Sequence, residues 1–96
     1  MATYICLLDW TQQGIENIKD SPGRLDDAKK AVEAAGGAVR DFYMTTGEHD
    51  MVLVLEAPDD ITLAKVLLRL GSKGSVRTTT MRAFTESEYR DIVGAV

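Results

Sequence analysis

Two stretches of the chain, residues 3–8 and 51–55, are apolar at nearly every position. Successive side chains of a β-strand point to opposite faces of a sheet, so a strand of this kind is covered on both faces and lies centrally. Residues 38–46 and 76–84 mix polar and apolar positions instead, which predicts edge strands. The pattern therefore predicts a four-stranded sheet with residues 3–8 and 51–55 in its middle.

Apolar residues at helical spacing separate these strands. The first helix is expected from Ser21, a favourable N-cap, to Gly36-Gly37, which can adopt a left-handed C-cap. The second begins at 58–60, where acidic side chains favour the positive end of a helix dipole. Its expected buried stripe is Ile61, Ala64, Leu68 and Gly71, widened by leucines at 63, 67 and 70. A capping box at 85–88 begins a last, amphipathic helix.

The order of these elements is β-α-β-β-α-β followed by a helix, the split βαβ arrangement of ferredoxin-like domains. The fold class is therefore α+β, in a single domain of 96 residues. The two longer helices cover one face of this sheet, yet its central strands are apolar on the other face too. We expect a second copy to cover that face, which makes the protein a homodimer, a dimeric α/β barrel. The alternative is that the last helix folds under the sheet.

Composition excludes several classes of function. The 15 acidic and 11 basic residues give a net charge of -4, which opposes binding to nucleic acid. Apolar runs are far shorter than the roughly 20 residues needed to span a bilayer, and no basic segment precedes an apolar core at the N-terminus. Cys6 is the only cysteine, so no intrachain disulfide forms, and a reactive thiol would require exposure near a positive charge. We therefore expect a cytoplasmic protein without a membrane or nucleic-acid partner.

The turn at Gly47-Glu48-His49-Asp50 is the first place to look for function. In the predicted topology this hairpin shares one rim of the sheet with the end of the first strand and the start of the fourth. His49 is the only histidine, and histidine side chains exchange protons near neutral pH. One histidine without a Cys/His cluster makes no zinc site, and no catalytic triad is recognisable. The sequence therefore predicts no metal, no cofactor and no assigned catalytic residue.

Five residues near this rim are predicted to bind a ligand: Trp10, Tyr43, His49, Asp50 and Arg77. Each has a structural alternative. Trp10 can cap the core, Tyr43 can lie in a dimer interface, and Arg77 can pair with surface acids. His49 can be a solvated turn residue beside an aspartate that serves turn geometry.

Several motifs resemble the GYD-domain family along nearly the whole chain. They are Trp10-Thr11-x-x-Gly14, Ser21-Pro22-x-Arg24, Phe42-Tyr43 leading to Gly47-Glu48-His49-Asp50, Glu56-Ala57-Pro58-Asp59-Asp60, and Val76-Arg77-Thr78 through Arg82-Ala83-Phe84-Thr85. The resemblance implies a dimeric α/β barrel that forms a dimer or a higher assembly, and it implies no established reaction. The family is named for a glycine, tyrosine and aspartate motif, and His49 stands at the position of that tyrosine. We therefore expect no role that depends on a phenol there.

These observations favour a homo-oligomeric module that binds a small, partly apolar organic molecule at the rim. A second hypothesis is a cofactor-independent enzyme, monooxygenase-like or isomerase-like, in which His49 shuttles a proton and Arg77 or Lys73 stabilises negative charge. A third is a purely structural or regulatory assembly protein. An apolar cavity that reaches His49 would favour binding or catalysis, whereas a solid core with His49 in solvent would favour assembly.

Overall fold

An antiparallel four-stranded sheet is the centre of the structure, a computed structural model that describes residues 1–96. The strand order is β2-β3-β1-β4. The strands are β1 (Ala2–Trp10), β2 (Ala38–Met44), β3 (Met51–Ala57) and β4 (Val76–Ala83). The two runs that are apolar on both faces, β1 and β3, therefore occupy the middle of the sheet, as predicted. The α+β, ferredoxin-like fold class is confirmed.

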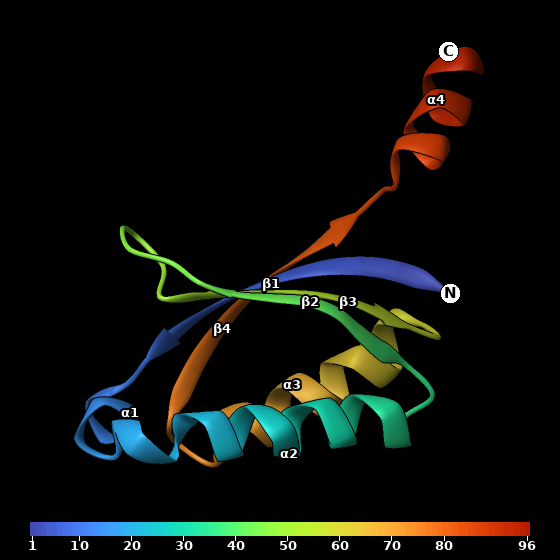
Figure 1. Cartoon of the computed structure of the whole chain (residues 1–96). Coiled ribbons are helices and arrows are strands. Elements are labelled where there is room, and N and C mark those ends of the chain that lie inside the picture. The colour runs from blue at the N-terminus through green and yellow to red at the C-terminus, as the bar shows by residue number, and fades with distance from the viewer.

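Helices cover only one face of this sheet. They are α1 (Gln12–Glu16), the single 3-10 turn η1 (Ile18–Asp20), α2 (Ser21–Ala34), α3 (Asp60–Ser72) and α4 (Glu86–Gly94). Figure 1 shows α2 and α3 side by side beneath the sheet, whereas α4 projects beyond the end of β4 on the opposite side. The sheet consequently has one face covered by helices and one helix-free face.

The hydrophobic core lies between the sheet and the two long helices. Every second residue of β1 and β3 points into it: Tyr4, Cys6, Leu8, Met51, Leu53, Leu55 and Ala57. Ala28 and Val32 of α2 and Leu63 and Val66 of α3 close it from below. Cys6 is completely buried, and this burial raises the pKa of its thiol, an effect that Thr80 on the neighbouring strand partly offsets. Cys6 is therefore a core residue and lacks the exposure that a reactive thiol needs.

The buried face of α3 differs from the predicted one. Ile61 and Leu68, expected in the core, are 71% and 76% exposed. The helix buries Leu63 and Val66 instead, with Leu67 and Leu70 half-buried beside them. The predicted stripe was wrong because α3 has apolar residues on more than half of its circumference. The side richest in large aliphatic side chains contacts the sheet.

Polar contacts at helix starts explain where these helices begin. Asp59 accepts a hydrogen bond from the backbone N–H of Thr62 at 2.7 Å, which lowers the pKa of the Asp59 carboxyl and caps α3. The Tyr4 hydroxyl donates to Asp60, a bond that raises the pKa of Tyr4 and ties β1 to α3. The predicted capping box of Thr85 and Glu88 is present at the start of α4. Ser21 is not the N-cap of α2, because Asp20 occupies that position.

The helix-free face of the sheet remains apolar and uncovered. Four half-buried side chains of the central strands lie on it: Ile5, Leu7, Val52 and Val54. Tyr43 and Met81 extend the apolar surface onto the edge strands and are exposed. No residue of α4 is buried, and this helix points away from the sheet (Figure 1). The alternative in which the last helix folds under the sheet is therefore wrong. No helix of the chain combines the length and apolar character that a membrane span requires.

The contact between α1 and the loop before β4 can be tested at Gly14. A Cβ atom on Gly14 would lie 2.1 Å from the carbonyl oxygen of Ser75, whereas one on Gly23 in α2 would meet nothing within 4 Å. We expect Gly14→Ala to lower the free energy of unfolding by about 1–3 kcal/mol through overpacking. Gly23→Ala should raise it by about 0.5–1 kcal/mol, since alanine favours a helix more than glycine does. Urea denaturation measures both, and an undisturbed Gly14→Ala variant would contradict this packing.

Candidate functional site

Two carboxylates connect the β2–β3 hairpin to the end of β1. Asp9 Oδ2 lies 3.1 Å from His49 Nδ1, and Asp9 Oδ1 accepts the backbone N–H of Asp50 at 3.2 Å. Asp50 Oδ2 in turn accepts the backbone N–H of Trp10 at 3.0 Å. Because an ionised carboxylate can only accept, the Nδ1 atom of His49 carries the hydrogen in this pair. The hairpin and β1 are thus linked in both directions: Asp9 of β1 binds the hairpin, and Asp50 of the hairpin binds the backbone of β1.

The Asp9–His49 pair has a geometry that acid–base chemistry could use. The carboxylate orients the imidazole through Nδ1 and leaves Nε2 free for a proton. The His49 side chain is 31% exposed. Neither of the two main cavities of the subunit is lined by His49. The pair therefore lies outside both of these cavities.

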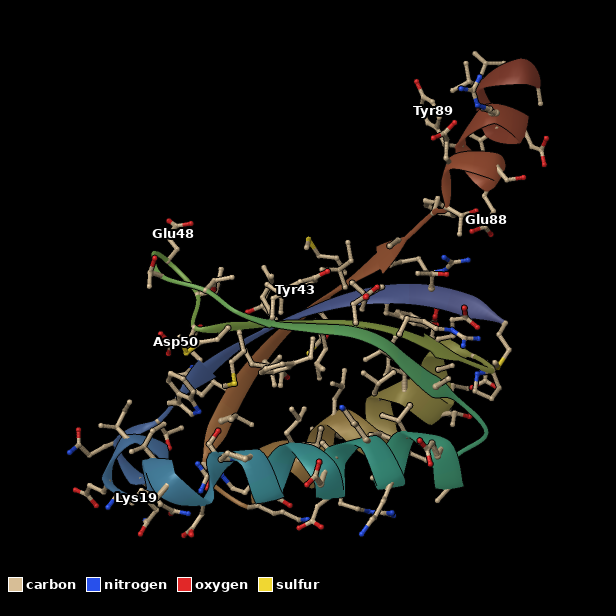
Figure 2. All side chains as sticks on the ribbon, viewed as in Figure 1. Lys19, Tyr43, Glu48, Asp50, Glu88 and Tyr89 are labelled. Carbon is tan, nitrogen blue, oxygen red and sulfur yellow. The ribbon has the colours of Figure 1, made fainter.

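Tyr43 and Arg77 lie on the helix-free face. Arg77 of β4 is the register partner of Asp9, whose side chain points away from the core because Leu8 points into it. Tyr43 is paired with Val52 and is 60% exposed, and Figure 2 shows it on the side of the sheet opposite α2. Arg77 forms no ion pair within the chain. Asp9 consequently lies between the hairpin on one side and the Arg77 strand on the other.

Trp10 lies on the opposite face of the sheet, which is the face that α2 and α3 cover. Its Nε1 atom donates to the Ser21 hydroxyl at 3.2 Å, which fixes the indole against the start of α2. The ring borders a cavity of about 340 Å³ that is otherwise lined mainly by Ile18, Pro22, Leu25, Phe42, Met44 and Met51. The structure therefore does not bring the five predicted residues together. Trp10 lines this cavity, and Tyr43 and Arg77 lie across the sheet from it. His49 and Asp50 lie at the hairpin between these two sides, where they contact Asp9 and the Trp10 backbone.

The predicted rim is otherwise assembled as the topology required. The backbone N–H of Thr11 donates to Ser75 at 3.1 Å, so the end of β1 meets the start of β4. Figure 2 shows Glu48 at the tip of the hairpin and Asp50 near its base. Asp9 is not one of the five predicted ligand residues, yet it holds both His49 and Asp50. The predicted topology places the end of the first strand, and Asp9 with it, on this rim, whereas the strand register decides which side chains meet there.

Comparison with known proteins agrees with this fold. The profile of the GYD domain matches residues 4–93. The chain belongs to the GYD family. A protein of Thermus thermophilus is 37% identical to it over 84 residues, which cover 86% of this chain and 88% of that one. That GYD relative is named "Glutamine synthetase and cystathionine beta-lyase binding protein".

Solved structures resemble this GYD protein more distantly. A feast or famine regulatory protein from M. tuberculosis, solved with L-methionine, matches with a TM-score of 0.67 and 19% identity over 88% of this chain. This chain spans about half of that regulatory protein, 51% of its length. A crystal structure from Thermus thermophilus matches with a TM-score of 0.56 and 24% identity, covering 88% of this chain and 95% of that one. These likenesses establish the fold alone.

Alanine variants can show whether Asp9 anchors the hairpin. Asp9→Ala removes the acceptor of two hydrogen bonds, and we expect it to lower the free energy of unfolding by about 1–2 kcal/mol. His49→Ala removes one of these bonds and should cost about 1 kcal/mol or less, because the pair is partly exposed. Glu48→Ala, at the tip, is the matched control and should change nothing. Thermal or urea denaturation would contradict the anchor if the Asp9 and Glu48 variants were equally stable.

Proposed function

We propose that this GYD protein is a homodimeric module that binds a small organic molecule and does not act as an enzyme. The observation that carries the proposal is the helix-free face of the sheet, which is apolar across the central strands and has no cover of its own. Contiguous exposed apolar surface on a soluble protein typically marks an interaction site. A catalytic role for His49 receives less support, since neither main cavity reaches its ring.

A second copy of the chain is the occupant that fits this face best. The surface spans both central strands and continues through Tyr43 and Met81 onto the edge strands. Two such faces can pack against each other as aligned sheets in an isologous dimer, which is the predicted dimeric α/β barrel. Burial of apolar surface contributes about 25 cal/mol for each Å², so covering the whole face would stabilise the pair substantially.

The position of α4 supports the same arrangement. Tyr89, Ile92 and Val93 recur at helical spacing on this helix, and all three are exposed. Figure 2 shows Tyr89 on a helix that stands clear of the body of the subunit, on the helix-free side. An apolar helix stripe without a partner in its own subunit is suited to packing against another molecule. Because α4 lies on the helix-free side, a second copy packed on that face could contact its apolar stripe.

In such a dimer the predicted ligand residues have different surroundings. Tyr43 and Arg77 would border the space between the two copies, with His49 at its margin. Trp10 would remain on the helix-covered side, where it lines the apolar cavity, and Asp50 would hold the backbone of Trp10 in place. We propose that binding of a small, partly apolar molecule belongs to this Trp10 side. A cytoplasmic location completes the proposal, since the single buried cysteine needs no oxidising compartment.

A second candidate function is the binding of larger enzymes. It is favoured by the Thermus thermophilus relative, whose name describes binding of glutamine synthetase and cystathionine β-lyase. The alignment covers 86% of this chain and 88% of the relative, so most of the surface of the relative has a counterpart in this chain. We propose that the dimer binds enzymes of the same two kinds, with the rim at the β2–β3 hairpin as the contact region, because the second copy covers the helix-free face.

The dimer proposal predicts which charge substitutions separate the copies. Val54→Glu places a carboxylate in the middle of the helix-free face, and we expect it to convert dimers into folded monomers. Leu68→Glu places the same charge on the exposed side of α3 and should leave the dimer intact. Light scattering after size exclusion measures the mass against the 10.5 kDa subunit, with circular dichroism to confirm folding. A wild-type monomer at micromolar concentration, or a dimer lost only in Leu68→Glu, would refute this interface.

The enzyme-binding candidate has its own test. Glutamine synthetase and cystathionine β-lyase purified from the same organism are each mixed with the wild-type protein at micromolar concentration. We expect co-elution with at least one enzyme, and an unrelated cytoplasmic enzyme of similar mass serves as control. Separate elution from both enzymes would rule out this second candidate while leaving the dimer measurement unaffected.

A further inference from the structure

The cavity beside Trp10 continues inward beneath the sheet. A second cavity of about 100 Å³ lies between α2, the end of α3 and the strands. Both cavities are bordered by Ser21, Leu25, Phe42 and Met51. Because four residues are shared, the two cavities adjoin. Together they fall within the range of about 300–1,000 Å³ that is typical of small-molecule sites.

The two ends of this space differ in chemistry. The outer end contains Trp10, Met44 and other apolar side chains and has no charged residue. The inner end is lined by Arg24 and Lys73, with Asp27 as the only acidic residue. A ligand that fills both ends would therefore need an apolar body and a polar head.

The cations at the inner end are available to a ligand. Neither Arg24 nor Lys73 forms an ion pair within the chain. Arg24 donates to the carbonyl oxygens of Asn17 at 3.0 Å and Gly14 at 3.4 Å. These two bonds hold the guanidinium in place, and the group has five N–H donors in all, so others remain free. The buried Ser75 hydroxyl is a further polar group on this wall.

We propose that this space binds a small monocarboxylic acid with an apolar body. Its carboxylate would lie between Arg24 and Lys73, since guanidinium groups match the geometry of carboxylates. Its body would extend past Phe42 toward Trp10. Asp27 leaves a net of one positive charge among the three ionised side chains, which disfavours a second carboxylate on the ligand. This inference rests on the proposed binding function, but it does not depend on the dimer because a single subunit supplies every wall.

Titration calorimetry with two ligands of the same shape tests the carboxylate assignment. Hydrocinnamate has a carboxylate at the end of a phenylpropyl skeleton, and hydrocinnamyl alcohol has a hydroxyl there. We expect the wild-type protein to bind the acid about tenfold more tightly than the alcohol, as one charge-assisted pair would produce. Equal affinities, or no binding of the acid, would overturn the proposal.

Variants locate the binding within the cavity. Lys73→Gln should weaken binding of the acid about tenfold and leave that of the alcohol unchanged, and Arg24→Gln should do the same if it folds. Lys30→Gln, on the exposed side of α2, is the matched control and should have no effect. An effect of Lys30→Gln equal to that of Lys73→Gln would indicate only nonspecific attraction and would refute the site.

The Val54→Glu variant separates this inference from the dimer. If monomeric Val54→Glu binds the acid as the wild type does, the site lies within one subunit, as proposed. If binding is lost together with the dimer, the ligand lies between copies and the inference is wrong. If the wild-type dimer forms but binds no acid, the carboxylate site is refuted and the dimer stands.

Discussion

The packing of α2 and α3 against one face of the sheet determines the rest of this structure. Cys6, Leu53 and Leu55 lie at the centre of that contact and are almost completely buried. Side chains alternate along a strand, so burial of these residues directs Ile5 and Val54 to the other face. The apolar helix-free surface is thus a direct consequence of the register that fills the core. A shift by one residue would exchange the two faces, so that Ile5, Leu7, Val52 and Val54 would replace the present core residues of the central strands against the helices.

The hairpin that carries His49 is held by a second set of constraints. The carboxylates of Asp9 and Asp50 bind backbone and ring N–H groups across the joint between β1 and the turn. Buried or half-buried polar groups of this kind specify one geometry, because their partners would otherwise lose hydrogen bonds. His49 therefore helps to hold the hairpin in place, in addition to being a side chain of the rim that could carry a proton. Any ligand that contacts it meets a rim whose shape is already fixed.

Much of the fold followed from the sequence because β1 and β3 are apolar on both faces and the edge strands are not. The orientation of α3 did not, since its many leucines allow more than one buried side and only the shape of the sheet selects between them. The candidate site was predicted as one group, yet Trp10 and Tyr43 lie on opposite faces of the sheet. Lys73 was considered from the sequence only as a rim cation that stabilises negative charge, and Arg24 was not predicted as a ligand residue, because the cavity that both line forms only when α2 and α3 pack against the sheet.

The length of α4 has a consequence for how the protein behaves when it is alone. Nine residues with a capping box and a Glu86–Arg90 pair make a short helix that buries no residue, and the Arg82–Glu88 ion pair at 3.9 Å connects it to β4. Isolated helices shorter than about 12–15 residues are marginal in water. Without a partner for its apolar stripe, α4 is therefore expected to be only partly helical in solution, and packing against the proposed second copy would stabilise the helix. In the proposed dimer, the ordering of α4 would cost conformational entropy that the new contact area offsets, and a single subunit would carry a protease-sensitive α4.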